Sequence, residues 1–168
     1  MTGAAEQKPE TLVGGVGKSA ARLAAVQALY QIDFSSSTSD SVHEQFLRYR
    51  LGDSFGVAGE IKPNKNLFSE IVRGVAGRQK EIDAVISRAL TKKWSFDRLE
   101  IILRAILRAG VYELTARMDT PARVVITEYV DVAHAFYNDR EPGLVNGMLD
   151  RIARTLRPGE FGDGSRGD

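Results

Sequence analysis

The sequence contains no cysteine, and this absence excludes disulfide bonds, thiol catalysis and cysteine-ligated zinc together. It also lacks any apolar run near the ~18 residues that a membrane-spanning helix needs. The N-terminal stretch has no apolar core of the kind that a secretory signal peptide requires. A cytoplasmic protein is therefore expected.

The chain also lacks an excess of either charge, because 23 basic and 22 acidic residues leave a net charge of only +1. A protein that binds nucleic acid alone usually has a marked positive excess, since neutralised phosphates supply most of the affinity. If this chain binds RNA, we expect its own electrostatic contribution to be small and a partner to supply the rest.

No arrangement of side chains typical of catalysis is visible. The only histidines, His43 and His134, fall on different predicted helices, so a metal site would need mostly carboxylates. We expect both to be solvent-facing or half-buried. The stretch Gly14–Ser19 (GGVGKS) resembles half of a phosphate-binding loop, but Leu12 stands where that motif's first glycine belongs. We therefore expect no enzyme activity, no metal and no cofactor.

The chain shows helical periodicity between its two ends and almost no strand alternation. We expect an all-α fold of about seven helices, over residues 18–33, 41–52, 66–77, 79–91, 97–117, 121–137 and 144–157. Residues 1–17 and 158–168 are polar and glycine-rich. This composition predicts a disordered leader and a flexible tail on either side of one helical domain, residues 18–157.

The helix expected over residues 97–117 is apolar around most of its circumference, which is typical of a central helix. Ile106 lies midway along it and is expected to be deeply buried. A narrow strip of Glu100, Arg104 and Arg108, at four-residue spacing, is expected to face outward.

Short motifs predict local structure at three places. A capping box begins at Ser41, and Thr120-Pro121 reads as an N-cap followed by proline at the first helical position. Gly147 lies inside the last predicted helix, where glycine costs about 1 kcal/mol relative to alanine. Close helix packing is therefore expected at Gly147, and Asn146 is expected to satisfy a buried backbone group.

Five sequence blocks resemble the NusB family and occur in the family's order and at its spacing. They cover roughly Ala20 to Arg157 and are AVQALYQID (Ala25–Asp33), FSEIVRGVAGRQKEID (Phe68–Asp83), RAILRAGVYEL (Arg104–Leu114), DTPARVVITEYVDVAHAF (Asp119–Phe136) and LVNGMLDRIAR (Leu144–Arg154). Each block alone is weak, but five in order on a helical chain of this length form a specific match.

The resemblance implies a NusB-like fold of two packed helical bundles around the central helix. It also implies binding of the boxA element of nascent ribosomal RNA transcripts, jointly with NusE, a small-subunit ribosomal protein. In the family, that complex joins NusA and NusG on RNA polymerase, so that transcription passes terminators.

In the family, RNA is held by an arginine-rich stretch that leads into the first helix and by the start of the last helix. Here the first stretch retains only Lys18 and Arg22 as basic residues, which also fit ordinary solvated charges at a helix start. Leu144 stands where many members have an aromatic residue that stacks on bases. Arg140, in the adjacent loop, adds positive charge. The resemblance implies RNA contacts at these four positions, with weakened affinity.

The family binds its protein partner around the start of the central helix and with a tyrosine of the first helix. The matching positions are Tyr30, Asp97, Leu103 and Arg104. Many members have an acidic residue where Leu103 stands, so one salt bridge to the basic ribosomal protein is missing. Leu103 and Tyr30 also fit positions in the hydrophobic core.

Two alternatives stay open at this point. One is a helical protein-interaction module without direct RNA binding, which the thinned basic patch and the near-zero net charge favour. The other concerns assembly, because the apolar faces of a NusB-like fold can pair with themselves. A homodimer of that kind would hide the RNA surface.

Overall fold

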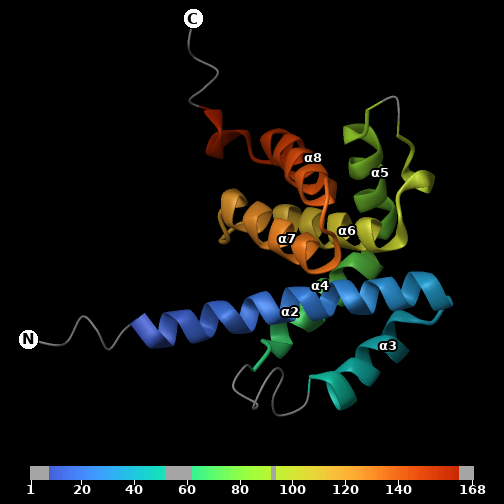
Figure 1. Ribbon diagram of the computed structural model, residues 1–168, viewed down its shortest axis with the longest axis vertical. Helices are drawn as coiled ribbons and strands as arrows, with labels where there is room; N and C mark the ends of the chain where they lie inside the picture. The colour runs from blue at the N-terminus through green and yellow to red at the C-terminus, as the bar shows by residue number, and fades with distance from the viewer. Residues whose placement is uncertain (1–7, 52–61, 92–93, 163–168) are drawn as a thin grey trace, which may run out of the picture. The chain divides into compact units, whose positions relative to one another are not determined.

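The computed structural model describes residues 8–51, 62–91 and 94–162, with side chains from residue 15 onward. These residues form seven α-helices and no β-strand (Figure 1), which confirms the predicted all-α class. None of the described helices is long and apolar enough to cross a membrane. The chain divides into two compact units, called here the N-terminal unit (residues 1–73) and the C-terminal unit (residues 74–168).

The N-terminal unit contains one long helix and several short ones. They are α2 (Lys8–Ser35), α3 (Ser39–Gln45), the π-helical turn η1 (Phe46–Arg50) and most of α4 (Lys65–Gly77). Figure 1 shows α3 beside the C-terminal half of α2, and residues of the two helices are in contact. The Phe68 ring of α4 stacks on both Phe46 and His43, with 5.7 Å between ring centroids in each pair. This aromatic cluster is the core that joins α4 to α3.

Helix α2 begins ten residues before the start that we predicted from the sequence. Residues 8–17, expected to be a disordered leader, are helical, whereas residues 1–7 lie outside the described part. Gly17 is buried, and its carbonyl accepts the Asn64 N–H at 3.0 Å. A Cβ added at Gly17 would lie 2.8 Å from the Lys62 carbonyl oxygen, so only glycine permits this approach. Gly17, which we assigned to a flexible leader from composition, is therefore a position at which the backbone packs closely.

Two helix starts differ from the predicted caps. The cap of α3 is Thr38, whose hydroxyl accepts the Ser41 N–H at 3.2 Å, so Ser41 lies inside the helix instead of capping it. In the C-terminal unit, α7 (Ala122–Phe136) has Pro121 as its N-cap, and no side chain of the preceding residues caps it. The Ala122 N–H instead donates to the Glu160 carboxylate at 2.9 Å, from a residue 38 positions away. No local motif reveals such a long-range cap.

The C-terminal unit is organised around α6, as the apolar circumference of that segment predicted. Its elements are α5 (Gln79–Ala89), η3 (Phe96–Arg98), α6 (Ile101–Ala116), α7, α8 (Glu141–Leu156) and η4 (Pro158–Glu160). Helix α6 contacts α5, α7 and α8 (Figure 1), and Ile106 at its middle is fully buried. A Cβ on Gly74 would overlap the Tyr112 ring, and one on Gly110 would lie 3.0 Å from Leu149. Both glycines let their neighbours pack closely.

The predicted outward strip of α6 is wrong at Arg108. This side chain is buried, with the residue 6% exposed, and its guanidinium binds both Asp83 carboxylate oxygens, at 2.8 and 3.0 Å. Helix α5 packs along this side of α6 and supplies the carboxylate. Glu100 is exposed and Arg104 is half-buried, so the strip opens to solvent only toward the start of the helix.

The segment after α8 is part of the fold through residue 162, although a flexible tail was expected from residue 158. The buried Arg157 guanidinium donates to four carbonyl oxygens at and after the end of α6, those of Glu113, Leu114, Arg117 and Thr120. Glu160 accepts from Arg157 as well as from α7, and Phe161 lies against the guanidiniums of Arg123 and Arg154. Residues 163–168 lie outside the described part.

Candidate functional site

The two basic candidates on α2 have different surroundings. Lys18 is exposed, whereas Arg22 is buried with only 3% of the residue exposed. Because α2 begins at Lys8, Lys18 lies in a helix interior and not at a helix N-terminus. The backbone amides near Lys18 are therefore hydrogen-bonded within the helix, so an anion at this place could bind only to side chains.

The other two RNA candidates lie at the start of α8. Arg140 is the N-cap residue, is exposed, and its carbonyl accepts the Leu144 N–H at 3.0 Å. Leu144 is half-buried in the first turn. Free amide groups and the helix dipole make a helix start attractive to anions, and the arginine adds a full positive charge there. This end of α8 therefore brings free amide groups and an arginine together with the Glu141 carboxylate of the first turn, whereas Lys18 is at no helix terminus.

Asn146 and the half-buried Gly147 continue the surface of α8 beyond Leu144. Asn146 is exposed, and a Cβ added at Gly147 would meet no atom within 4 Å. The structural roles predicted for this pair, a buried hydrogen bond and close helix packing, are therefore wrong. Both residues border a surface that a bound molecule can approach closely.

The loop that carries Arg140 is tied to the start of α6. The Tyr137 hydroxyl donates to the Glu100 carboxylate at 3.1 Å. Burial raises the pKa of Tyr137, and the hydrogen bond and charge of Glu100 raise it further. Tyr137 thus stays a neutral donor throughout the physiological range, which fixes the end of α7 against the α6 N-terminus.

The partner candidates of the C-terminal unit lie around this same start of α6. Asp97 is exposed in η3, whereas Leu103 is buried with 5% exposed and belongs to the core. Arg104 is half-buried, and its guanidinium lies over the Phe96 ring at 5.5 Å from the centroid. Arg108 approaches the same ring at 5.2 Å. Phe96, which sequence reasoning missed, therefore holds the Arg104 guanidinium over its ring.

Tyr30 lies on α2 in the N-terminal unit and is half-buried. Its ring stacks on Phe34, with 5.5 Å between centroids and 17° between planes. Phe34 is 66% exposed, so the pair presents an aromatic surface near the end of α2. The spacing of four residues was the available signal for Phe34, because such residues are neighbours on a helix. Lys18 is twelve residues from Tyr30, roughly 18 Å along α2.

The two histidines differ in their surroundings. Among the described residues, no group of three or more potential ligands comes together. His43 is buried, contrary to expectation, and its Nε2 lies 2.7 Å from the Ser69 hydroxyl oxygen. Burial lowers the pKa of His43, and the positive charge of Arg73 lowers it further. His134 is exposed, as expected.

Comparison with known proteins gives one consistent family. The family model described as "NusB family" matches residues 19–154. Transcription antitermination protein NusB of Bradyrhizobium diazoefficiens is 46% identical over 147 residues, covering 88% of this chain and 89% of the relative. Its counterpart in Mesorhizobium japonicum is 49% identical over 140 residues, covering 83% of this chain and 90% of the relative.

Solved structures agree with these sequence matches. T. maritima NusB superposes with a TM-score of 0.69 at 30% identity, covering 86% of this chain and 96% of the other. A chain from the structure named "Crystal Structure of a Plectonemic RNA Supercoil" gives a TM-score of 0.68 at 26% identity, covering 82% and 94%. With a family model spanning most of its length and relatives nearly half identical, this chain belongs to the NusB family.

Proposed function

We propose that this protein is a cytoplasmic transcription antitermination factor that binds boxA RNA of nascent ribosomal RNA transcripts together with NusE. In this proposal, the binary complex joins NusA, NusG and RNA polymerase. The observation that carries the proposal is identity of 46–49% to proteins named transcription antitermination protein NusB, over more than four fifths of both chains.

The RNA surface that the geometry supports best is centred on the start of α8. Arg140 and the first turn of the helix attract phosphate, and the half-buried Leu144 offers an apolar surface to an unpaired base. In the N-terminal unit, exposed Lys18 of α2 is a separate candidate for a phosphate contact. Arg22 is buried, so we assign it the role of holding α2 in place rather than of contacting RNA.

We propose two candidate partner surfaces, a charged one in the C-terminal unit and an aromatic one in the N-terminal unit. Asp97 and Arg104 at the start of α6 offer charges of both signs, and Phe96 holds Arg104 in position. In the N-terminal unit, Tyr30 and the exposed Phe34 of α2 form the aromatic surface, and aromatic residues are enriched in the cores of protein interfaces. Leu103 supports α6 from within the core and makes no contact with the partner.

The test is fluorescence anisotropy of a labelled boxA RNA with the protein alone, with NusE alone and with both. We expect tight binding only with both, because a net charge of +1 gives this chain little electrostatic affinity. Replacing Lys18 and Arg140 by alanine should weaken binding of the complex. It should also flatten the salt dependence by about 0.7 per lost phosphate contact. Lys80→Ala, on the exposed side of α5, is the matched control.

The second candidate function is a protein-interaction module without direct RNA contact. The burial of Arg22 and the near-zero net charge favour it. In the same experiment, that function would give complexes whose RNA affinity and salt dependence equal those of NusE alone. Charge reversal at Asp97 and Arg104 would then still weaken the affinity for NusE.

A further inference from the structure

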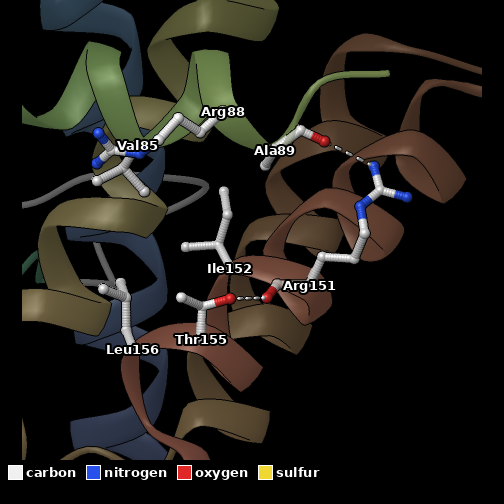
Figure 2. Close-up of a pocket in the computed structure, with 7 residues that line it drawn as sticks. All are labelled: Val85, Arg88, Ala89, Arg151, Ile152, Thr155 and Leu156. Carbon is white, nitrogen blue, oxygen red and sulfur yellow. Dashed lines mark hydrogen bonds between the residues drawn. The ribbon is translucent and has the colours of Figure 1, made fainter. Parts of the chain in front are cut away.

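A groove in the C-terminal unit lies between α5 and α8, apart from the residues discussed above. It has a volume of about 350 Å³, near the lower end of the range for ligand sites. Figure 2 shows its lining residues, which are Val85, Arg88, Ala89, Arg151, Ile152, Thr155 and Leu156.

The floor of the groove is apolar. Ile152 lies at its centre in Figure 2, and Val85 and Leu156 are half-buried on the same side of the view. Because these side chains already pack in the fold, the groove is formed without rearrangement. An apolar side chain of about the size of leucine would find a complementary surface here.

The charge of the groove has a single sign. Arg88 and Arg151 are both exposed and lie on opposite sides of Ile152 in Figure 2, and no acidic residue lines the groove. Arg151 donates to the carbonyl of Ala89 at 3.3 Å, which holds its side chain along the edge of the groove. Among the described residues, no ion pair or hydrogen bond engages the Arg88 side chain.

Two other exposed arginines pair with carboxylates on their own helices. Arg48 pairs with Glu44 at 3.1 Å, and Arg154 pairs with Asp150 at 2.9 Å. The groove has no such carboxylate, so Arg88 and Arg151 place two positive charges beside an apolar floor. Planar guanidiniums bind carboxylates in two-pronged geometry.

We propose that the α5–α8 groove binds a short acidic segment of a partner protein, in which an apolar side chain is flanked by carboxylates. The apolar side chain lies on Ile152, and the carboxylates bind Arg88 and Arg151. A nucleic acid would use the two arginines but would leave the apolar floor unmatched. The floor therefore favours a peptide.

The experiment selects short random peptides displayed on phage against the full-length protein, with the variant Arg88→Glu/Arg151→Glu as counter-selection. We expect enrichment of sequences with an apolar residue between acidic ones. For a synthetic peptide of that sequence, the double variant should weaken binding by at least about tenfold, because each exposed pair is worth a few-fold and is replaced by repulsion. Lys80→Glu makes the same change of charge on α5 outside the groove and should leave affinity unchanged.

A second variant tests the floor without changing charge. Thr155→Trp places a large side chain at the exposed edge of the groove and should block the same peptide, so the test does not depend on the double variant alone. Selection of basic or uncharged sequences would overturn the proposal, as would binding that survives either variant. Binding of polyuridine RNA with the same dependence on Arg88 and Arg151 would identify a nucleic acid as the occupant instead.

Discussion

Replacing Arg157 by methionine should destabilise the fold far more than its position near the C-terminus suggests. Its guanidinium donates to the carbonyls of Glu113 and Leu114, at 3.1 and 2.9 Å, in buried surroundings. It also donates to Arg117 and Thr120, at 2.9 and 2.6 Å, where burial is partial. Methionine keeps the apolar stem but supplies no donor to any of these groups.

The magnitude follows from which carbonyls water can reach. Water can replace the guanidinium at the two partly buried carbonyls, so their loss costs little. The buried Leu114 carbonyl would lack a partner, at about 1–3 kcal/mol, whereas the Glu113 carbonyl keeps the Arg117 N–H at 3.0 Å. The expected loss is therefore about 1–3 kcal/mol, a substantial part of the ~5–15 kcal/mol that stabilises a typical domain.

Urea denaturation followed by circular dichroism at equilibrium measures this loss. The matched control is Arg154→Met in the last turn of α8, whose side chain is 53% exposed and, among the described residues, pairs with Asp150 and the ring of Phe161. That variant should lose no more than about 1 kcal/mol. Equal unfolding free energies for the two variants would refute the reasoning, because they would show that the α6 carbonyls do not depend on Arg157.

Three further predictions concern α6 and His43. Ile106→Ala should lower the free energy of unfolding in urea by about 2–5 kcal/mol, since Ile106 is fully buried. A smaller loss would contradict the central position of α6 in its unit. Arg108→Ala should cost about 1.5–3 kcal/mol, since it removes two charged hydrogen bonds to Asp83, and a near-neutral effect would contradict the buried pair. The pKa of His43 is lowered in the folded state, so the unfolded chain binds the proton more readily and stability should fall as pH drops below about 6.5. Thermal midpoints measured between pH 5 and 8 should show this fall in stability, and the fall should be smaller in His43→Gln. An equal pH dependence of the midpoint in the variant would show that other groups cause the fall.

Helical periodicity predicted the fold class and the central position of α6 because both depend on the spacing of apolar residues. The same pattern was wrong at Arg108, since a four-residue spacing of charged residues does not distinguish solvent from a carboxylate on the neighbouring helix. The caps at Thr38 and Glu160 depend on loop conformation and on a contact 38 residues away. Membership of the NusB family, whose antitermination proteins are non-enzymatic, confirms that the chain is not an enzyme.

For the candidate site, the sequence predicted which residues match the family's binding positions, but not their burial or their contacts. The resemblance identified Asp97 and Arg104, but the need for Phe96 beneath Arg104 follows from the turn η3, which has no helical periodicity. Arg22 was expected at a helix start and is instead buried within a longer helix. The RNA and partner contacts themselves stay predictions until binding is measured.

The most direct test of the proposed function is read-through of a terminator in a purified transcription system. The template carries boxA upstream of the terminator, and the reaction contains RNA polymerase, NusA, NusG and NusE. We expect the protein to increase read-through, and expect this increase to disappear when boxA is scrambled or when Lys18 and Arg140 are both replaced by alanine. Read-through that the protein does not change, or that it changes equally on the scrambled template, would contradict antitermination through boxA.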